Sequence, residues 1–177
     1  LRAGPPSKPP TTMAEIDEEK NALNLTKYEA VYFAYAYPTS KLQFSFKYQL
    51  IEKIPVYFGY TQVLFWNLGQ DSQPFKDVNY GPEVFHHLEI KSGALESIDL
   101  APYAHLSNGR DGAASRTINR AYARFNFQRP LSEGTLKLAA TVFGFYGLSS
   151  DNSDIYKYVG PIDLKFTVTQ FIPWVFD

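Results

Sequence analysis

The 177-residue chain contains no cysteine, which excludes disulfide bonds, thiolate nucleophiles and cysteine-based zinc sites. Neither sign of charge predominates, because 17 Lys and Arg residues stand against 18 Asp and Glu residues and the formal net charge is −1. Nucleic-acid-binding proteins usually carry a basic surface, so we expect no nucleic-acid partner. The chain also lacks a run of about eighteen apolar residues, so no membrane-spanning helix is expected.

What the sequence has in abundance is alternation of apolar and polar residues, which begins near residue 25 and indicates β-strands. In the stretch 42–50, LQFSFKYQL, the Leu, Phe and Tyr side chains share one face and the Gln, Ser and Lys side chains share the other. The pattern predicts an all-β antiparallel meander with one apolar and one polar face. Eight strands separated by turn residues are expected, at 26–37, 42–51, 55–67, 79–91, 96–107, 118–129, 134–147 and 159–171.

Two folds fit this pattern. A soluble sandwich or lipocalin-like barrel would bury the apolar face, whereas a transmembrane β-barrel would turn it to lipid and keep the polar face inside. Strands of about ten residues favour the transmembrane barrel. Aromatic residues near strand ends favour it too, as interfacial girdles do: Tyr28, Tyr37, Trp66, Tyr80, Tyr103, Tyr146 and Tyr158. On the polar face, interior ion-pair networks are expected from Glu29, Lys47, Glu83, Lys137 and Lys165.

The segment 103–122, YAHLSNGRDGAASRTINRAY, holds His105 and Ser107 two positions apart, which places both on one face of a strand. Serine becomes a nucleophile when a base takes its proton and a third group orients that base. Asn119 lies at the start of the next strand, where a hairpin can bring it beside His105. It alternates in step with Ala121, Ala123, Phe125 and Phe127, which places it on the apolar face. On spacing alone, the same residues are more typical of a polar turn than of a catalytic site.

This segment resembles the active site of the outer membrane phospholipase A family, which is calcium-dependent. It has the family's H-x-S-N-G-R, a short loop ending in S-R, and N-R with the Asn fourteen places after the His. Two more stretches resemble the family in the same order, GYTQVLFWNL…SQPFKDVNYGPEVF before it and DNSDIYKYVG after it. The resemblance covers about residues 26–171, and on it the chain is identified as a member of that family, with phospholipase A1 activity implied.

The resemblance implies a role for each matching residue. Ser107 would be the nucleophile, His105 the general base and Asn119 the residue that orients His105. Backbone N–H groups around Ser107 and Gly109 would stabilise the oxyanion.

The resemblance also implies a cofactor and a partner. A calcium ion would be held by the Arg110 carbonyl and Ser115, and Ser72 of a second subunit would complete its site. Gln62 matches the polar residue at the family's dimer face. The implied protein is a homodimer that hydrolyses acyl esters of glycerophospholipids in the outer membrane of a Gram-negative bacterium.

The sequence departs from the family pattern in several places. Residues 1–24 are rich in Pro and charge, so we expect them to be a disordered leader. The family barrel has about twelve strands and only eight are expected here, so we expect residues 25–177 to be a C-terminally truncated barrel domain. The loop before Ser72 is short, and Asp111 stands one place before the family's acidic residue. Simple alternation would place the charged Asp99 on the same face as His105, which is the apolar face. A β-bulge between the two residues would place them on opposite faces.

The alternative to an active phospholipase is an inactive or non-catalytic barrel, such as a pore or a ligand-binding barrel. His86 and His87 are adjacent on a strand and point to opposite faces, so they are not expected to bind one metal ion together. Asp151 and Asp154 either bind calcium or form a loop with Asx-turns. Trp66 and Trp174 are expected to be interfacial anchors.

Overall fold

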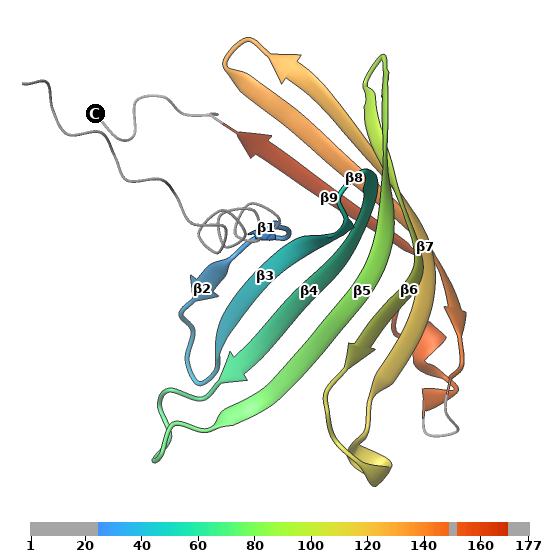
Figure 1. The fold of residues 1–177 in the computed structure, drawn as a ribbon. Helices are drawn as coiled ribbons and strands as arrows, with labels where there is room; N and C mark the ends of the chain where they lie inside the picture. The colour runs from blue at the N-terminus through green and yellow to red at the C-terminus, as the bar shows by residue number, and fades with distance from the viewer. Residues whose placement is uncertain (1–24, 149–151, 170–177) are drawn as a thin grey trace, which may run out of the picture.

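The computed structural model describes residues 25–148 and 152–169. These residues form one antiparallel sheet of nine strands with two short 3-10 helices in its connections (Figure 1). The strands are β1 Leu25–Lys27, β2 Tyr32–Ala34, β3 Ser40–Ile51, β4 Ile54–Trp66, β5 Phe75–Ser92, β6 Leu95–Ser107, β7 Thr117–Leu131, β8 Gly134–Tyr146 and β9 Ile162–Thr169. The 3-10 helices are η1 Gly112–Ala114, between β6 and β7, and η3 Ile155–Lys157, between β8 and β9.

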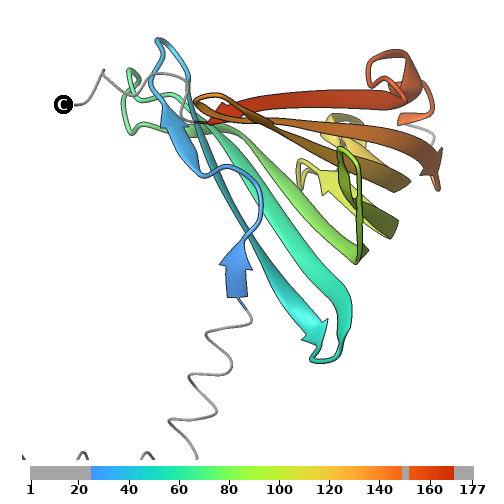
Figure 2. The same cartoon turned by 90° about the horizontal axis from the view of Figure 1, so that it is seen from above.

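Each long strand pairs with its neighbour in the sequence, and the order is β1-β3-β4-β5-β6-β7-β8-β9, with β2 also on β3. The sheet curls into a half-barrel, whose strands form a curved wall when viewed from above (Figure 2). Within the described residues no strand pairing joins β9 to the β1 and β2 edge, so the sheet keeps two open edges. The all-β antiparallel barrel meander expected from the alternation is confirmed.

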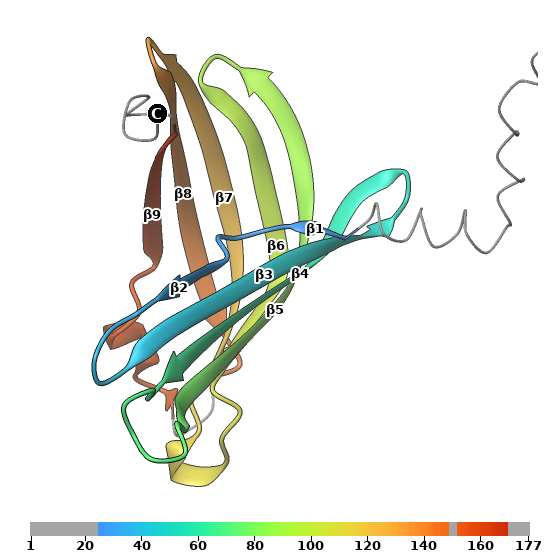
Figure 3. The same ribbon diagram turned by 90° about the vertical axis from the view of Figure 1, so that its left-hand side faces the viewer.

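The expected first strand, 26–37, is wrong, because the chain forms β1 and β2 separately on the edge of β3 (Figure 3). Between them Tyr28 turns into the concave side of the sheet, where its ring stacks on Phe85 at 5.1 Å between centroids. Its hydroxyl also lies 3.2 Å from the Tyr122 hydroxyl. This inward turn interrupts the pairing, so one long edge strand cannot form. The other seven expected strands are present with shifted ends.

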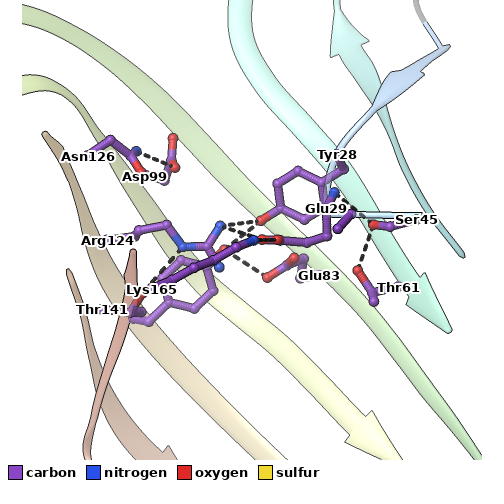
Figure 4. A network of polar contacts seen from close by, with 12 residues as sticks. Tyr28, Glu29, Ser45, Thr61, Glu83, Asp99, Arg124, Asn126, Thr141 and Lys165 are labelled. Carbon is purple, nitrogen blue, oxygen red and sulfur yellow. Dashed lines mark hydrogen bonds and ion pairs between the residues drawn. The ribbon is translucent and has the colours of Figure 1, made fainter. Parts of the chain in front are cut away.

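The concave face of the half-barrel contains a small buried cluster and a polar network. The buried cluster consists of Phe85, Ala101, Ala104 and Tyr122. Around it, charged side chains pair across strands that are distant in the sequence (Figure 4). This arrangement places the polar face of the strands inside, as expected for a transmembrane barrel.

Glu29 is at the centre of the polar network, where it forms ion pairs with Lys165 and, at 3.4 Å, with Arg124. Glu83 accepts a hydrogen bond of 2.7 Å from the Tyr122 hydroxyl. These contacts confirm an interior network around Glu29, Glu83 and Lys165. A cavity of about 780 Å³ lies on the concave side and is lined by Glu29 and Lys165. The two other expected members, Lys47 and Lys137, line it too.

The convex face is apolar. Large apolar side chains along β6, β8 and β9 are exposed on the described chain: Leu100, Tyr103, Val142, Tyr146, Ile162, Leu164, Phe166 and Val168. An exposed apolar surface of this extent marks contact with lipid or with another protein. None of the helices in the described residues has the length and apolarity needed to cross a membrane.

His86 and His87 lie on opposite faces, as expected. His87 Nδ1 lies 2.5 Å from the carboxylate of Asp99 on the concave side. His86 is in register with Val56 and with the exposed Leu100. No cluster of three or more His, Asp or Glu side chains that could hold a metal ion occurs in the described ranges.

Trp66 and Asp154 lie at the same end of the sheet, where β4 and β8 end (Figure 1). Trp66 ends β4, and its Nε1 donates a 2.8 Å hydrogen bond to the Gln73 carbonyl. Asp154 precedes η3 and makes no side-chain cap there. Asp151, Trp174 and the expected leader lie outside the described residues.

Candidate active site

A β-bulge in β6 determines which residues of this strand face outward. Relative to β7, the register shifts between Ala101 and Ala104, where three steps along β6 oppose two along its partner. Pro102 lies in this bulge, where its missing N–H removes no regular ladder bond. Asp99 therefore faces the cavity before the bulge and Ala104 joins the buried cluster after it, so that His105 faces outward. The β-bulge expected between Asp99 and His105 is confirmed.

His105 and Asn119 are partners in the β6–β7 register, both on the convex face. His105 Nδ1 lies 2.8 Å from Asn119 Oδ1. On its other side, Asn119 donates from Nδ2 to the Gly147 carbonyl at 3.4 Å. Because the amide nitrogen is the donor to Gly147, the amide oxygen must accept the proton of His105 Nδ1. In the neutral imidazole with its proton on Nδ1, the opposite ring nitrogen, Nε2, can act as a base.

Ser107 lies on the same outward face as His105, two residues further along β6. Its hydroxyl is 3.3 Å from the Thr117 hydroxyl and accepts a 3.1 Å hydrogen bond from the Gly109 N–H. Within the described part of the chain, no hydrogen bond joins Ser107 to His105. In ligand-free sites, contacts between a nucleophile and its base are often loose.

Asn108 organises the loop that follows Ser107. Its Oδ1 accepts hydrogen bonds from the N–H groups of Arg110, at 3.3 Å, and Arg116, at 2.9 Å. Its Nδ2 donates to the Ala114 carbonyl at 2.9 Å. The loop is thereby closed on itself, which holds Arg110 and Ser115 on one compact segment beside the serine.

The Arg110 side chain fastens this loop to the start of β5. Its Nη2 donates a 2.6 Å hydrogen bond to the Lys76 carbonyl and lies 3.4 Å from Asp77 Oδ1. Among the described residues, neither the Arg110 carbonyl nor the Ser115 hydroxyl takes part in a hydrogen bond. Both oxygens are therefore available as ligands for a cation.

Gly109 is a position where only glycine fits. Its φ of +64° is in the left-handed region, which side chains rarely adopt. A Cβ there would also lie 2.8 Å from the ring of Tyr80, which is the register partner of Ser107. The close approach of the ring and the backbone holds the Gly109 N–H toward the Ser107 hydroxyl.

Gln62 lies in the same transverse row of the sheet as the serine. It is in register with Tyr80, and Tyr80 is in register with Ser107. Its Oε1 accepts a 3.0 Å hydrogen bond from the hydroxyl of Tyr60. This places a polar amide on the mainly apolar convex face, as the alternation of residues along the strand predicts.

Ser72 lies in the β4–β5 connection, at the same end of the sheet as the loop with η1 (Figure 1). Its φ is +62° and that of Gln73 is +43°, although neither is glycine. Left-handed residues with side chains are strained and are concentrated at functional sites. In the described chain no hydrogen bond joins Ser72 to Ser107 or Ser115.

Sequence reasoning missed several residues that shape this site. Thr117 holds the Ser107 hydroxyl, Asn108 closes the loop and Gly147 accepts from Asn119. Two of these left a signal, because Asn108 is part of the resembling motif and Gly147 directly follows a strand. Thr117 left none, because its role depends on the exact register of two strands.

The fold and the site define a curled antiparallel barrel sheet with a Ser, His and Asn group on its apolar convex face. The chain belongs to the phospholipase A1 family, whose model matches residues 38–171. It is 33% identical over 139 residues to the putative phospholipase A1 of Neisseria meningitidis serogroup B, covering 71% of this chain and 36% of that protein. The chain therefore spans about a third of the length of this relative.

Solved structures show the same fold. Outer membrane phospholipase A from Escherichia coli matches with a TM-score of 0.68 and 25% identity, over 80% of this chain and 70% of that chain. The calcium-bound dimer of the Salmonella typhi outer membrane phospholipase matches with a TM-score of 0.61 and 29% identity, over 72% of this chain and 52% of that chain.

Proposed function

We propose that this chain acts as a calcium-dependent phospholipase A that hydrolyses acyl esters of glycerophospholipids in the outer membrane of a Gram-negative bacterium. The observation that carries the proposal is the 2.8 Å hydrogen bond between His105 and Asn119 on the apolar face that also holds Ser107. An ester group of a lipid lying against this face would reach the serine without entering the barrel. Membership in the phospholipase A1 family supports the same substrate.

In the proposed reaction, Ser107 Oγ attacks the ester carbonyl while His105 Nε2 takes its proton. His105 then gives this proton to the leaving lysophospholipid oxygen, and water releases the fatty acid from Ser107 in a second round. Asn119 keeps the proton of the resting imidazole on Nδ1. The backbone N–H groups of Ser107 and Gly109 stabilise the negative charge that develops on the carbonyl oxygen.

The oxygen atoms near Ser107 suit a calcium ion. Calcium takes oxygen ligands, and the Arg110 carbonyl and the Ser115 hydroxyl offer two without other partners among the described residues. A complete shell needs more ligands than these two, and Ser72 of a second subunit and water would supply them. When bound, the ion adds positive charge beside the oxyanion.

A homodimer follows from this need for a second Ser72. The exposed convex face offers the contact surface, and Gln62 would meet its partner there in the row that leads to Ser107. A buried amide in a lipid-facing surface is costly unless a partner satisfies it. The Salmonella typhi relative, a dimer with bound calcium, supports the same assembly for this chain.

The test is ester hydrolysis by the purified chain in mixed micelles of detergent and phospholipid, with and without calcium. Ser107→Ala should abolish hydrolysis, whereas Ser92→Ala, in the exposed end of the β5–β6 hairpin, should leave it unchanged. Hydrolysis that survives Ser107→Ala would exclude the serine mechanism. No hydrolysis by the unaltered chain at any calcium concentration would favour a non-catalytic barrel.

A further inference from the structure

The end of β8 reaches the candidate active site from the strand beside Asn119. Asn119 and Tyr146 form the terminal pair of the β7–β8 register. Gly147 follows directly, and its carbonyl accepts the hydrogen bond from Asn119 Nδ2 at 3.4 Å. The Asn119 amide is therefore held between two groups, His105 on β6 and Gly147 after β8.

The Gly147 carbonyl determines which way the Asn119 amide points. If the amide were reversed, its oxygen would face the carbonyl oxygen of Gly147 and its nitrogen would face His105 Nδ1. Two acceptors would then lie against each other, which is unfavourable. In that orientation Nδ1 would have to accept, and the imidazole proton would move to Nε2. An imidazole with its proton on Nε2 cannot take a proton from Ser107.

The backbone at Gly147 makes this contact possible. Its φ is +58°, in the left-handed region where side chains are strained. A Cβ at this position would lie 3.4 Å from Asn119 Nδ2. The same glycine thus turns the chain out of β8 and directs its carbonyl to the amide.

A second contact ties the end of β8 to the site. The Tyr146 hydroxyl donates a 3.3 Å hydrogen bond to the carbonyl of Pro102, in the β6 bulge. Tyr146 therefore reaches across β7 to the segment that turns His105 outward. Beside it, the ring of Tyr103 is parallel to that of His105, with 6.3 Å between centroids.

We propose that the Gly147 carbonyl is a positioning group of this site, which sets the orientation of the Asn119 amide and through it the tautomer of His105. The proposal rests on the proposed hydrolase function for its kinetic consequence. Its structural consequence, a single imidazole tautomer, is measurable without turnover.

The experiment compares Gly147→Ala with Gly93→Ala in the full chain in detergent. Gly93 is a matched control, because its φ is +61° and a Cβ there would meet nothing within 4 Å. Both positions have a left-handed φ, and only at Gly147 would a Cβ contact Asn119. Gly147→Asn is a third variant, since asparagine tolerates the left-handed region better than alanine.

Two measurements are made on each variant. Nitrogen-15 NMR of labelled histidine reports the tautomer, and the His105 signal is assigned by its loss in His105→Gln. We expect the unaltered chain and Gly93→Ala to hold the proton on Nδ1, and Gly147→Ala to show a mixture. We also expect Gly147→Ala to lower kcat by roughly tenfold or more with little change in KM, since the base and not substrate binding is affected. Gly147→Asn should recover part of both.

Identical tautomers and identical kcat in Gly147→Ala and Gly93→Ala would overturn the proposal. Failure of the proposed hydrolase function alone would give another, distinguishable result. In that case the unaltered chain shows no hydrolysis, while the tautomer still responds to Gly147→Ala and not to Gly93→Ala.

Discussion

Asn119 Oδ1 lies 2.8 Å from His105 Nδ1 across the β6–β7 pair, on the convex face of the half-barrel. The two residues are fourteen positions apart in the sequence and directly opposite in the sheet. Their contact leaves His105 Nε2 free on the side of the sheet where Ser107 also points. The arrangement places a candidate base, its orienting amide and a nucleophile where acyl chains would lie.

His105 is the first residue to test by substitution. His105→Gln should lower kcat by about 10²- to 10⁴-fold, the usual contribution of a general base. His86→Gln is the matched control, because His86 also lies on the convex face and is in register with the exposed Leu100. Steady-state hydrolysis of a phospholipid in micelles gives both rates. Equal rates for the two variants would exclude His105 as the base.

The fit between Gly109 and Tyr80 predicts a compensating pair of substitutions. Gly109→Ala should abolish most activity, because its Cβ would lie 2.8 Å from the Tyr80 ring. Truncating the ring in Tyr80→Ala/Gly109→Ala removes that clash, so the double variant should be more active than Gly109→Ala alone. The comparison is made on kcat/KM. If Tyr80→Ala gives no recovery, the left-handed φ at Gly109 and not the ring is the dominant constraint.

Calcium dependence should respond to Ser115. Ser115→Ala removes one proposed oxygen ligand, so we expect a higher calcium concentration at half-maximal activity and little change in the maximal rate. Ser92→Ala, remote from the loop, should leave the calcium titration unchanged. A titration curve that is the same in both variants would contradict the assignment of Ser115.

The role of Ser72 can be tested by mixing two inactive variants. If Ser72 of a second subunit completes the calcium site, Ser72→Ala should be inactive alone at a low calcium concentration, and Ser107→Ala should be inactive alone at any concentration. Mixed dimers contain one subunit with an intact Ser107 whose partner has an intact Ser72, so the mixture should regain activity. The activity is measured after the two variants are unfolded together and refolded in detergent. A mixture as inactive as its components would mean that Ser72 does not act across an interface.

The bulge at Pro102 predicts the effect of a deletion. Removing one residue from the bulge would shift the following residues by one position, and a shift of one position reverses the faces of a strand. His105 and Ser107 would then point into the cavity, and hydrolysis should be lost while the sheet is kept, as measured by circular dichroism.

Thiol labelling tests the same change of face. Because the chain has no cysteine, Ser107→Cys gives a unique thiol. A reagent on the lipid side should label this thiol in the chain with the bulge and should not label it in the deletion variant.

The sequence was sufficient to predict most strands and the outward position of Asn119, because alternation in a regular strand determines the face of each residue. The sequence also indicated that the alternation of faces along β6 is interrupted before His105, although it did not show at which residue. It could not predict the break between β1 and β2, since Tyr28 leaves the edge to contact Phe85, which is far away in the sequence. The contact between Gly147 and Asn119 likewise depends on how β8 ends beside β7.

An activated serine hydroxyl on the convex face can be detected by covalent labelling of Ser107. The chain in detergent is treated with a fluorophosphonate, which reacts with activated serine hydroxyls, and the modified peptide is identified by mass spectrometry. We expect one adduct, on Ser107, that is lost in Ser107→Ala and strongly reduced in His105→Gln but unchanged in His86→Gln. An unlabelled Ser107, or an adduct that forms equally well in His105→Gln, would contradict the proposed serine mechanism.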